Sequence, residues 1–154
     1  NQLLSLWQAS GARGRAMVAI ALYVASMTLF WATVAACRGR QLTAIFEADP
    51  PLFLIERGPY RYVRHPFYLS YSICWVAGSV STGALWTATL AVIMTVTYVR
   101  AARHEEGKFA GSTLAEQYAA YADVTGFIWP RLARPRRARK EDKSSAASTF
   151  VSQF

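Results

Sequence analysis

The chain has 154 residues, of which 53% are apolar and 17% charged, and its formal net charge is +8. That length suits a single domain. The apolar residues are concentrated in two long segments without a charged residue, 16–37 and 66–99. Because about 20 apolar residues suffice to cross a bilayer, this distribution predicts an integral membrane protein. It excludes a water-soluble enzyme built on a central sheet.

The chain holds few residues that could bind a metal or form disulfides. It has two cysteines, Cys37 and Cys74, and two histidines, His65 and His104. These are too few for a disulfide framework or a Cys/His zinc site, so no metal is predicted. Both cysteines fall in apolar segments, where a thiol is expected to act as a small hydrophobic group.

The two apolar segments differ in length. A helix over 16–37 would be about 33 Å long, which fits a hydrocarbon core of about 30 Å. A helix over 66–99 would be about 51 Å long, far beyond that core. Small, turn-forming residues fill 78–83. We therefore predict two short helices, 66–80 and 84–103, joined by a tight turn. The predicted fold is all-α and integral to the membrane, with about three transmembrane helices, the last two forming a short hairpin.

The basic residues predict the orientation in the membrane. Two of the 17 precede the first helix, none lies in the hairpin turn, and 15 lie in the 38–65 connection or after Val99. Three crossings place these 15 on one side, which is therefore predicted to be cytoplasmic. The charge is segregated by the membrane and accompanied by no recognition motif, so nucleic-acid binding is not expected.

The C-terminal region is predicted to have two parts. Thr113 and Glu116 make a capping box, so a short amphipathic cytoplasmic helix is expected to start there. We assign residues 1–131 to one membrane domain and 132–154 to a basic tail, expected to be disordered and attracted to anionic lipid. The chain starts at Asn1 instead of Met, which leaves room for residues further upstream.

Two polar clusters lie at the predicted cytoplasmic ends of the hairpin. The first is 58–68, in which Pro66 suits the first position of a helix. Arg64 and His65 then lie at a helix N-terminus, which favours an anion and a neutral imidazole. The second cluster contains Arg100, Arg103, His104, Glu105 and Glu106. Since the hairpin returns to the same surface, we expect the clusters to converge on one cavity, open to the cytosol and to lipid.

Each cluster also has a purely structural interpretation. Arginines and tyrosines beside a membrane commonly act as topology signals and headgroup anchors, which would account for Arg61, Tyr60 and Tyr62. His65 could be only a helix cap. The paired acids could form an ion pair with Arg103 or Arg61.

These motifs resemble a known family. The segments GPYRYVRHPFY, the hydrophobic hairpin, HEE, QYAAY and FIWP are similar in order to the isoprenylcysteine carboxyl methyltransferases, which are related to the phospholipid N-methyltransferases. The resemblance covers about residues 50–131. It implies a membrane methyltransferase that takes S-adenosylmethionine from the cytosol and methylates a lipophilic acceptor from the bilayer.

The resemblance also implies roles for individual residues. Arg64, His65, Pro66 and Tyr68 correspond to the RHPxY element that walls the cofactor pocket. Glu105 and Glu106 correspond to the family's paired acids, of which at least one contacts the cofactor. Tyr118 and Tyr121 correspond to an aromatic element that packs the cytoplasmic cap. Departures are Ser70, where the family usually has glycine, Ala101 in place of an arginine, and Thr113-Leu114 in place of Phe-Gly. The arginine that orients the acceptor is accordingly either Arg100 or Arg103.

The chemistry of these residue types agrees with methyl transfer, which mainly requires alignment and exclusion of water. We assign catalytic roles to Arg64, His65, Glu106 and Arg103. We assign cofactor contacts to Tyr60, Arg64, His65, Pro66, Tyr68, Glu105 and Glu106. Carboxylates can bind an ammonium or ribose hydroxyls, and Tyr60, Tyr62 or Tyr68 can flank a sulfonium. An amine or thiol acceptor would need a general base, whereas a carboxylate would not.

Three other functions fit parts of the sequence. They are a membrane reductase similar to the sterol reductases, a haem-dependent isomerase similar to the NnrU group, and a non-catalytic membrane subunit. Methyl transfer to a membrane lipid or lipidated small substrate is preferred because both motif clusters fall on one membrane face. The expected location is the bacterial inner membrane or the endoplasmic reticulum, with the active site and C-terminus in the cytoplasm.

Overall fold

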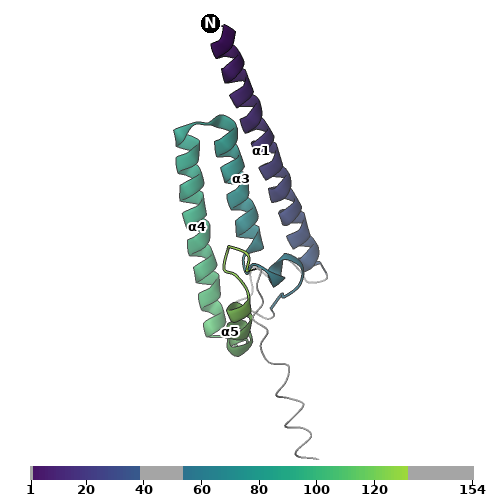
Figure 1. Cartoon of the computed structure of the whole chain (residues 1–154). Coiled ribbons are helices and arrows are strands. Elements are labelled where there is room, and N and C mark those ends of the chain that lie inside the picture. Colours follow the sequence, from purple (N-terminus) through teal and green to yellow (C-terminus); the bar gives the residue numbers. More distant parts are fainter. Residues whose placement is uncertain (1, 39–53, 132–154) are drawn as a thin grey trace, which may run out of the picture.

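A computed structural model describes residues 2–38 and 54–131 of the chain. These residues form four α-helices and one short 3-10 helix, with no strand among them, which confirms the all-α prediction. The elements are α1 (Gln2–Cys37), η1 (Gly58–Arg61), α3 (Pro66–Thr82), α4 (Leu85–Ala110) and α5 (Ala115–Val124). Figure 1 shows α3 between α1 and α4, with α5 beyond one end of the three long helices. The predicted tail lies outside the described residues.

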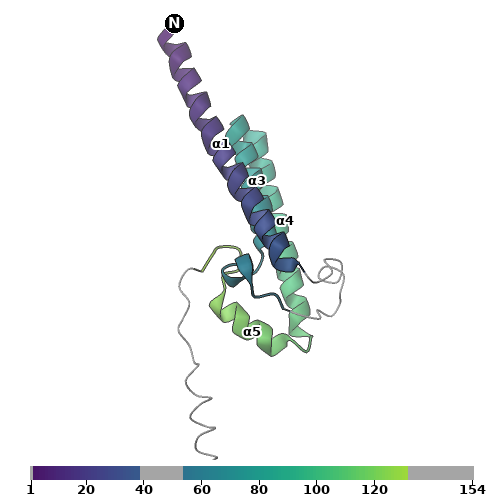
Figure 2. The ribbon, with the colours of Figure 1, turned by 90° about the vertical axis from the view of Figure 1, so that its right-hand side faces the viewer.

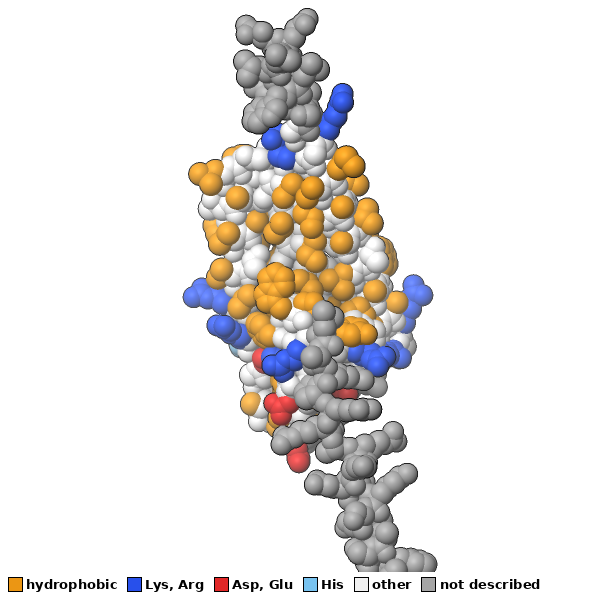
Figure 3. All heavy atoms as spheres, viewed as in Figure 1, with side chains coloured by type: hydrophobic (Ala, Val, Ile, Leu, Met, Phe, Trp, Pro, Cys, Tyr) orange, Lys and Arg blue, Asp and Glu red, His pale blue; other side chains and the backbone are white. Residues whose placement is uncertain are grey.

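Two of the described helices are long and apolar enough to cross a membrane: Gly11–Cys37 in α1, and α4. Helix α3 has 17 residues, and its length is therefore about 26 Å. Hydrophobic side chains cover the middle of the molecule, and Lys and Arg side chains lie toward both of its ends (Figure 3). This distribution is typical of a membrane protein.

Helix α1 starts further upstream than predicted. It runs without a break from Gln2, well before the predicted start at Ala16, and its N-terminal part extends past the hairpin turn (Figures 1 and 2). The charges of Arg13 and Arg15 suggested a boundary there. Arginine is a good helix former, however, and no proline interrupts the segment.

The predicted hairpin is confirmed, with longer arms. Helix α3 starts at Pro66, as predicted, and ends at Thr82. Gly83 follows with a left-handed backbone (φ 64°), which allows the tight turn. Helix α4 continues past its predicted end at 103 to Ala110, because no proline stops it. As a result, both adjacent acids lie on a helix instead of in a loop.

Small residues bring the long helices close together. On α1, the buried residues Ala19, Ser26 and Thr33 recur at a regular heptad spacing. Helix α1 packs on α3, where Ser70 and Ala77 are also buried. The Ser26 hydroxyl donates to the Ser70 carbonyl at 2.7 Å. Side chains of this size allow backbones to approach closely, which is a common packing mode of membrane helices.

The end of α1 is tied to η1. Arg57 donates from Nε to the Ala36 carbonyl at 2.7 Å and from Nη2 to the Arg38 carbonyl at 2.6 Å. These bonds satisfy carbonyls that the end of a helix leaves free. Gly58 follows with φ 61°, so close to α1 that an added Cβ would lie 2.9 Å from the Ala36 Cβ. The loop that leads into α3 is thus fixed against α1.

The predicted capping box is wrong. Helix α5 starts at Ala115 with Leu114 at the N-cap, and none of the described side chains caps it. Instead, the Ser112 hydroxyl accepts the Leu114 N–H at 3.2 Å. A serine two positions before an amide readily makes such a local turn, which here takes the place of the cap by Thr113.

Candidate active site

The loop before α3 is hydrogen-bonded to the loop after α5. Val63 and Gly126 form a parallel bridge, and the Arg64 N–H donates to the Gly126 carbonyl at 2.8 Å. The next amide, His65 N–H, donates to the Phe127 carbonyl at 3.3 Å. The backbone of the RHP segment is therefore positioned by a segment that lies far from it along the chain.

The loop after α5 passes so close to its own backbone that position 126 must be glycine. A Cβ added there would collide with the backbone carbonyl of Trp129. The loop thus turns back on itself directly after its bonds to Arg64 and His65. Only glycine permits backbones to pass this closely.

Arg64 connects three elements. Its Nε donates to Glu106 Oε1 on α4 at 2.7 Å, and its Nη1 donates to the carbonyls of Ala122 at 3.0 Å and Thr125 at 2.6 Å. The Arg64 and Glu106 side chains are 14% and 23% exposed, so the pair is largely shielded from water. The rigid fork of a guanidinium suits such simultaneous contacts.

His65 faces both adjacent acids. Its Nε2 lies 3.2 Å from Glu106 Oε1 and its Nδ1 lies 3.6 Å from Glu105 Oε2. One turn along α3, the Tyr68 hydroxyl donates to Glu105 Oε1 at 2.5 Å. We call Arg64, His65, Tyr68, Glu105 and Glu106 the polar cluster. The predicted convergence of the two motifs is therefore present.

The imidazole of His65 is held in its neutral form. Its side chain is 9% exposed, and burial lowers its pKa, an effect that Glu106 and Glu105 only partly oppose and that Arg64 reinforces. An ionised Glu106 paired with Arg64 can only accept a hydrogen bond. In neutral His65 the hydrogen therefore belongs on Nε2, which leaves the lone pair on Nδ1.

The two acids differ in environment. Glu106 contacts both Arg64 and His65. The Glu105 side chain is 42% exposed, and its Oε2 faces the neutral imidazole of His65. Glu105 thus presents a carboxylate oxygen at the surface of the cluster. Among the five side chains it is the one best placed to meet a ligand.

Tyr118 adds an unsatisfied hydroxyl beside the cluster. Its ring stacks on Phe109 at 4.3 Å, and its hydroxyl oxygen is buried without a hydrogen-bond partner among the described residues. Burial and the neighbouring Glu106 carboxylate both raise the pKa of Tyr118, although the two groups are not in hydrogen-bonding geometry. A buried hydroxyl without a partner is costly, so this one is a candidate donor to a ligand.

Two of the predicted site residues lie apart from the polar cluster. Arg103 is exposed and makes no ion pair within the described part of the chain. The ion pair with Glu106 is made by Arg64, so the alternative in which Arg103 or Arg61 pairs with the acids is wrong. Tyr60 turns its hydroxyl toward the Cys37 thiol on α1 at 3.8 Å, and its carbonyl accepts the Tyr121 hydroxyl at 2.7 Å. Pro66 is fully buried at the start of α3.

Two aromatic residues border the cluster without having been predicted to do so. The Tyr98 ring stacks on Tyr68 with centroids 5.6 Å apart, and Phe127 lies edge-to-face on His65 at 5.2 Å. Tyr98 could have been found from the sequence, because it lies two helical turns before Glu105 and so on the same face of α4. Phe127 falls in the quoted FIWP motif, but its partner depends on the loop pairing described above.

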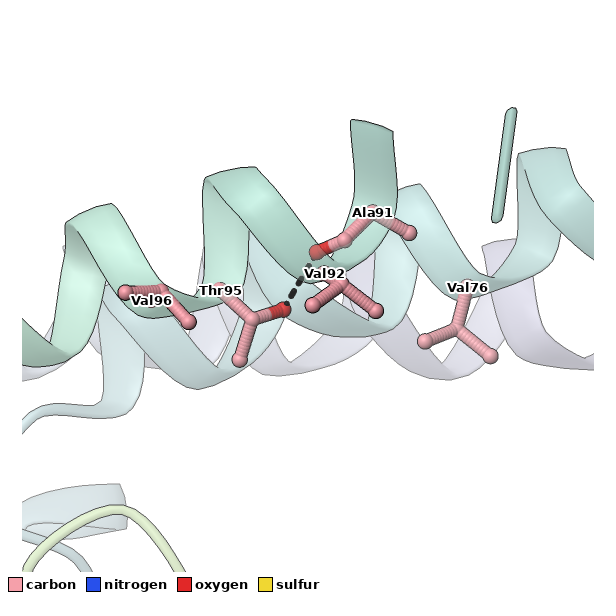
Figure 4. A pocket seen from close by; sticks show the side chains of 5 residues that line it. All are labelled: Val76, Ala91, Val92, Thr95 and Val96. Atoms are coloured by element: carbon pink, nitrogen blue, oxygen red, sulfur yellow. Dashed lines mark hydrogen bonds between the residues drawn. The ribbon is translucent and has the colours of Figure 1, made fainter. Parts of the chain in front are cut away.

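One pocket lies further along the hairpin, away from the two motifs between which a cavity was expected. It has a volume of about 210 Å³ and is lined by Val76, Ala91, Val92, Thr95 and Val96 (Figure 4). The Thr95 hydroxyl donates to the Ala91 carbonyl at 2.8 Å, so this side chain has no unsatisfied hydrogen there. The pocket is an apolar groove on the seam between α3 and α4.

A family model described as phospholipid methyltransferase matches residues 14–120, which is more than half of the chain. The chain therefore belongs to the phospholipid methyltransferase family, which confirms the family relationship expected from the motifs. Membership makes it a membrane methyltransferase. No curated protein and no solved structure matched the chain.

Replacing Arg64 tests its connecting role. We expect Arg64→Gln to lower the free energy of unfolding by about 2–4 kcal/mol, because Glu106 loses its charged partner and two carbonyls lose their donor. The measurement is thermal unfolding in detergent. Arg61→Gln, at a nearby exposed arginine, is the control and should shift stability by less than about 0.5 kcal/mol. Equal effects of the two substitutions would contradict the assignment.

His65 should make stability depend on pH. In the unfolded chain its pKa is near 6.5, and in the folded protein it is lower, so below about pH 6.5 the unfolded chain binds the proton first. The contribution of neutral His65 to the free energy of unfolding is fully present above about pH 6.5. It is lost as the pH falls toward the folded pKa, by up to about 1.4 kcal/mol per pH unit. His65→Gln should remove this part of the decrease in melting temperature between about pH 7.5 and 5.5. His104→Gln, at an exposed histidine, should retain it.

Proposed function

We propose that this protein transfers the methyl group of S-adenosylmethionine to a lipophilic acceptor at the cytoplasmic face of the membrane. The observation that carries the proposal is the polar cluster at the start of α3 and the end of α4, beside an apolar hairpin. Family membership supplies the reaction class and does not favour the reductase, isomerase or subunit alternatives.

The residues present fit S-adenosylmethionine, which supplies an electrophilic methyl group on a cationic sulfur. Glu105 offers a half-exposed carboxylate oxygen, and Tyr118 a buried hydroxyl that lacks a partner among the described residues. Both suit ribose hydroxyls or an ammonium group. With His65 neutral and Arg64 balanced by Glu106, the cluster keeps one net negative charge, which favours a cationic ligand.

The cluster divides into contact and positioning residues. We assign contact roles to Glu105, Tyr68, His65 and Tyr118. Arg64 and Glu106 act as positioning residues, since the N–H groups of Arg64 are largely used within the protein. A carboxylate acceptor needs no base, whereas an amine or thiol acceptor can lose its proton to Nδ1 of neutral His65. Arg103 remains available to an acidic group on the acceptor.

Three crossings and a cytoplasmic site are part of the same proposal. Helix α3 reaches across most of a hydrocarbon core of about 30 Å, and a bilayer adapts to a mismatch of a few ångströms. The polar cluster lies at the end of the hairpin that carries most of the basic residues, which favours the cytoplasmic side.

The apolar groove supports a lipophilic acceptor. Ala91, Thr95, Tyr98, Ala102 and Glu105 follow one another at helical spacing, so they share a face of α4. Thr95 and Glu105 lie about 15 Å apart along the helix axis. A hydrocarbon chain in the groove would thus have its polar end directed along the seam toward Glu105.

The binding of S-adenosylmethionine tests the reaction. We expect Glu105→Gln to weaken binding about 10- to 100-fold in calorimetry, as a charged hydrogen bond contributes about 1.5–3 kcal/mol. Glu116→Gln, on the exposed surface of α5, is the matched control and should bind like the wild type. Failure of the wild-type protein to bind S-adenosylmethionine would refute the proposal.

Filling the groove tests the acceptor. Val92→Trp should raise the KM for a long-chain acceptor about tenfold, because excluding two methylenes costs about 1.6 kcal/mol, and leave a short-chain analogue unaffected. The measurement is transfer of labelled methyl groups to lipids of graded chain length. Ile93→Trp, on a neighbouring exposed residue outside the groove, is the control. If both variants behave alike while S-adenosylmethionine still binds, the groove is not the acceptor site.

A further inference from the structure

Trp129 is one of the most exposed apolar side chains that the structure describes. Its exposure is 80%, and it lies in the loop that follows α5. Leaving a ring of this size in water forfeits much of the favourable free energy of burying it. Something other than the described protein is therefore expected to cover it.

The loop that carries Trp129 is held firmly, so the exposure is not that of a frayed end. On one side of the tryptophan, Gly126 N–H donates to the Tyr62 carbonyl at 3.1 Å. On the other side, Arg131 N–H donates to the same carbonyl at 3.1 Å, and Arg131 Nη1 donates to the Asp123 carbonyl at 2.6 Å. The ring is thus presented outward by a fixed backbone.

The position of the loop indicates what covers the ring. In Figures 1 and 2 the segment after α5 rises from that helix to the level at which α1 ends, while α5 itself lies beside the far end of α4. Because α1 is a candidate membrane span that ends at Cys37, we infer that the membrane surface lies near this level. The loop lies there in both views.

The neighbours of Trp129 have the composition of a membrane interface. Tyr62 is 50% exposed, and Arg61 and Arg131 are also exposed. Aromatic rings with polar edges gather at the boundary between headgroups and acyl chains, and arginines there meet lipid phosphates. We call Arg61, Tyr62, Trp129 and Arg131 the interfacial patch.

We propose that the interfacial patch docks on the headgroup layer of the phospholipid leaflet, with the indole of Trp129 entering the boundary with the acyl chains. The inference goes beyond methyl transfer and does not rest on it. Because the same loop accepts hydrogen bonds from the backbone amides of Arg64 and His65, lipid contact at Trp129 would also hold the polar cluster in place.

The test measures where the indole lies. The full chain is labelled with 5-fluorotryptophan and placed in vesicles of phosphatidylcholine and phosphatidylglycerol, and the Trp129 resonance is assigned by its loss in Trp129→Phe, or in Trp129→Tyr if the first variant does not fold. A nitroxide at the lipid headgroup should broaden this resonance strongly, and a water-soluble relaxation agent should leave it sharp. Trp75, inside α3, is the depth control and should respond to a nitroxide deep in the acyl chains.

Two results would overturn the proposal. Broadening by the water-soluble agent but not by the headgroup nitroxide would show that the ring stays in water. Insensitivity to every agent would show that another protein surface covers it, for example a second copy of the chain. Neither result depends on enzymatic activity, so calorimetry with S-adenosylmethionine still decides the proposed function separately.

Discussion

The arrangement of the end of the molecule that carries the polar cluster depends on the ion pair between Arg64 and Glu106. A carboxylate that is only 23% exposed needs a partner, and Arg64 supplies it from a different part of the chain. The same guanidinium also binds the carbonyls of Ala122 and Thr125, at the end of α5, where helix carbonyls lack internal partners. One side chain therefore positions the start of α3, the end of α4 and the end of α5.

The pair can form only because the long helices hold the two motifs in register. Buried small residues allow this on each helix: Ser70 and Ala77 on α3, and Ala91 and Ala102 on α4. The stack of Tyr68 on Tyr98 then sets the rotation of α4 that brings Glu105 within reach of the Tyr68 hydroxyl. The polar contacts at the end of the helices thus depend on how the helices pack in the apolar region.

The sequence predicts the local features well, because their causes are local. Pro66 opens a helix and Gly83 ends one through properties of those residues alone. The convergence of RHP with the paired acids follows from the hairpin between them. The choice of Arg64 over Arg103 does not, since several arginines lie close to the same surface and only the packed structure decides which one reaches Glu106. The hydrogen bonds from the Arg64 and His65 amides to the Gly126 and Phe127 carbonyls are even harder to predict from the sequence. Every residue has a carbonyl, so the residue type does not mark the partner.

The ion pair also explains why two adjacent acids are not redundant. Glu106 is committed to Arg64 and His65, so its charge is balanced inside the protein. Glu105 is left with one oxygen bound by Tyr68 and the other facing the unprotonated nitrogen of a neutral histidine, a position that provides no favourable partner for a carboxylate. A ligand that carries positive charge or hydroxyl groups would relieve this deficit. The internal pairing of Glu106 therefore leaves Glu105 free to bind a ligand in the proposed function. On that proposal, a substitution at Arg64 is expected to weaken ligand binding through Glu105 as well as to lower stability.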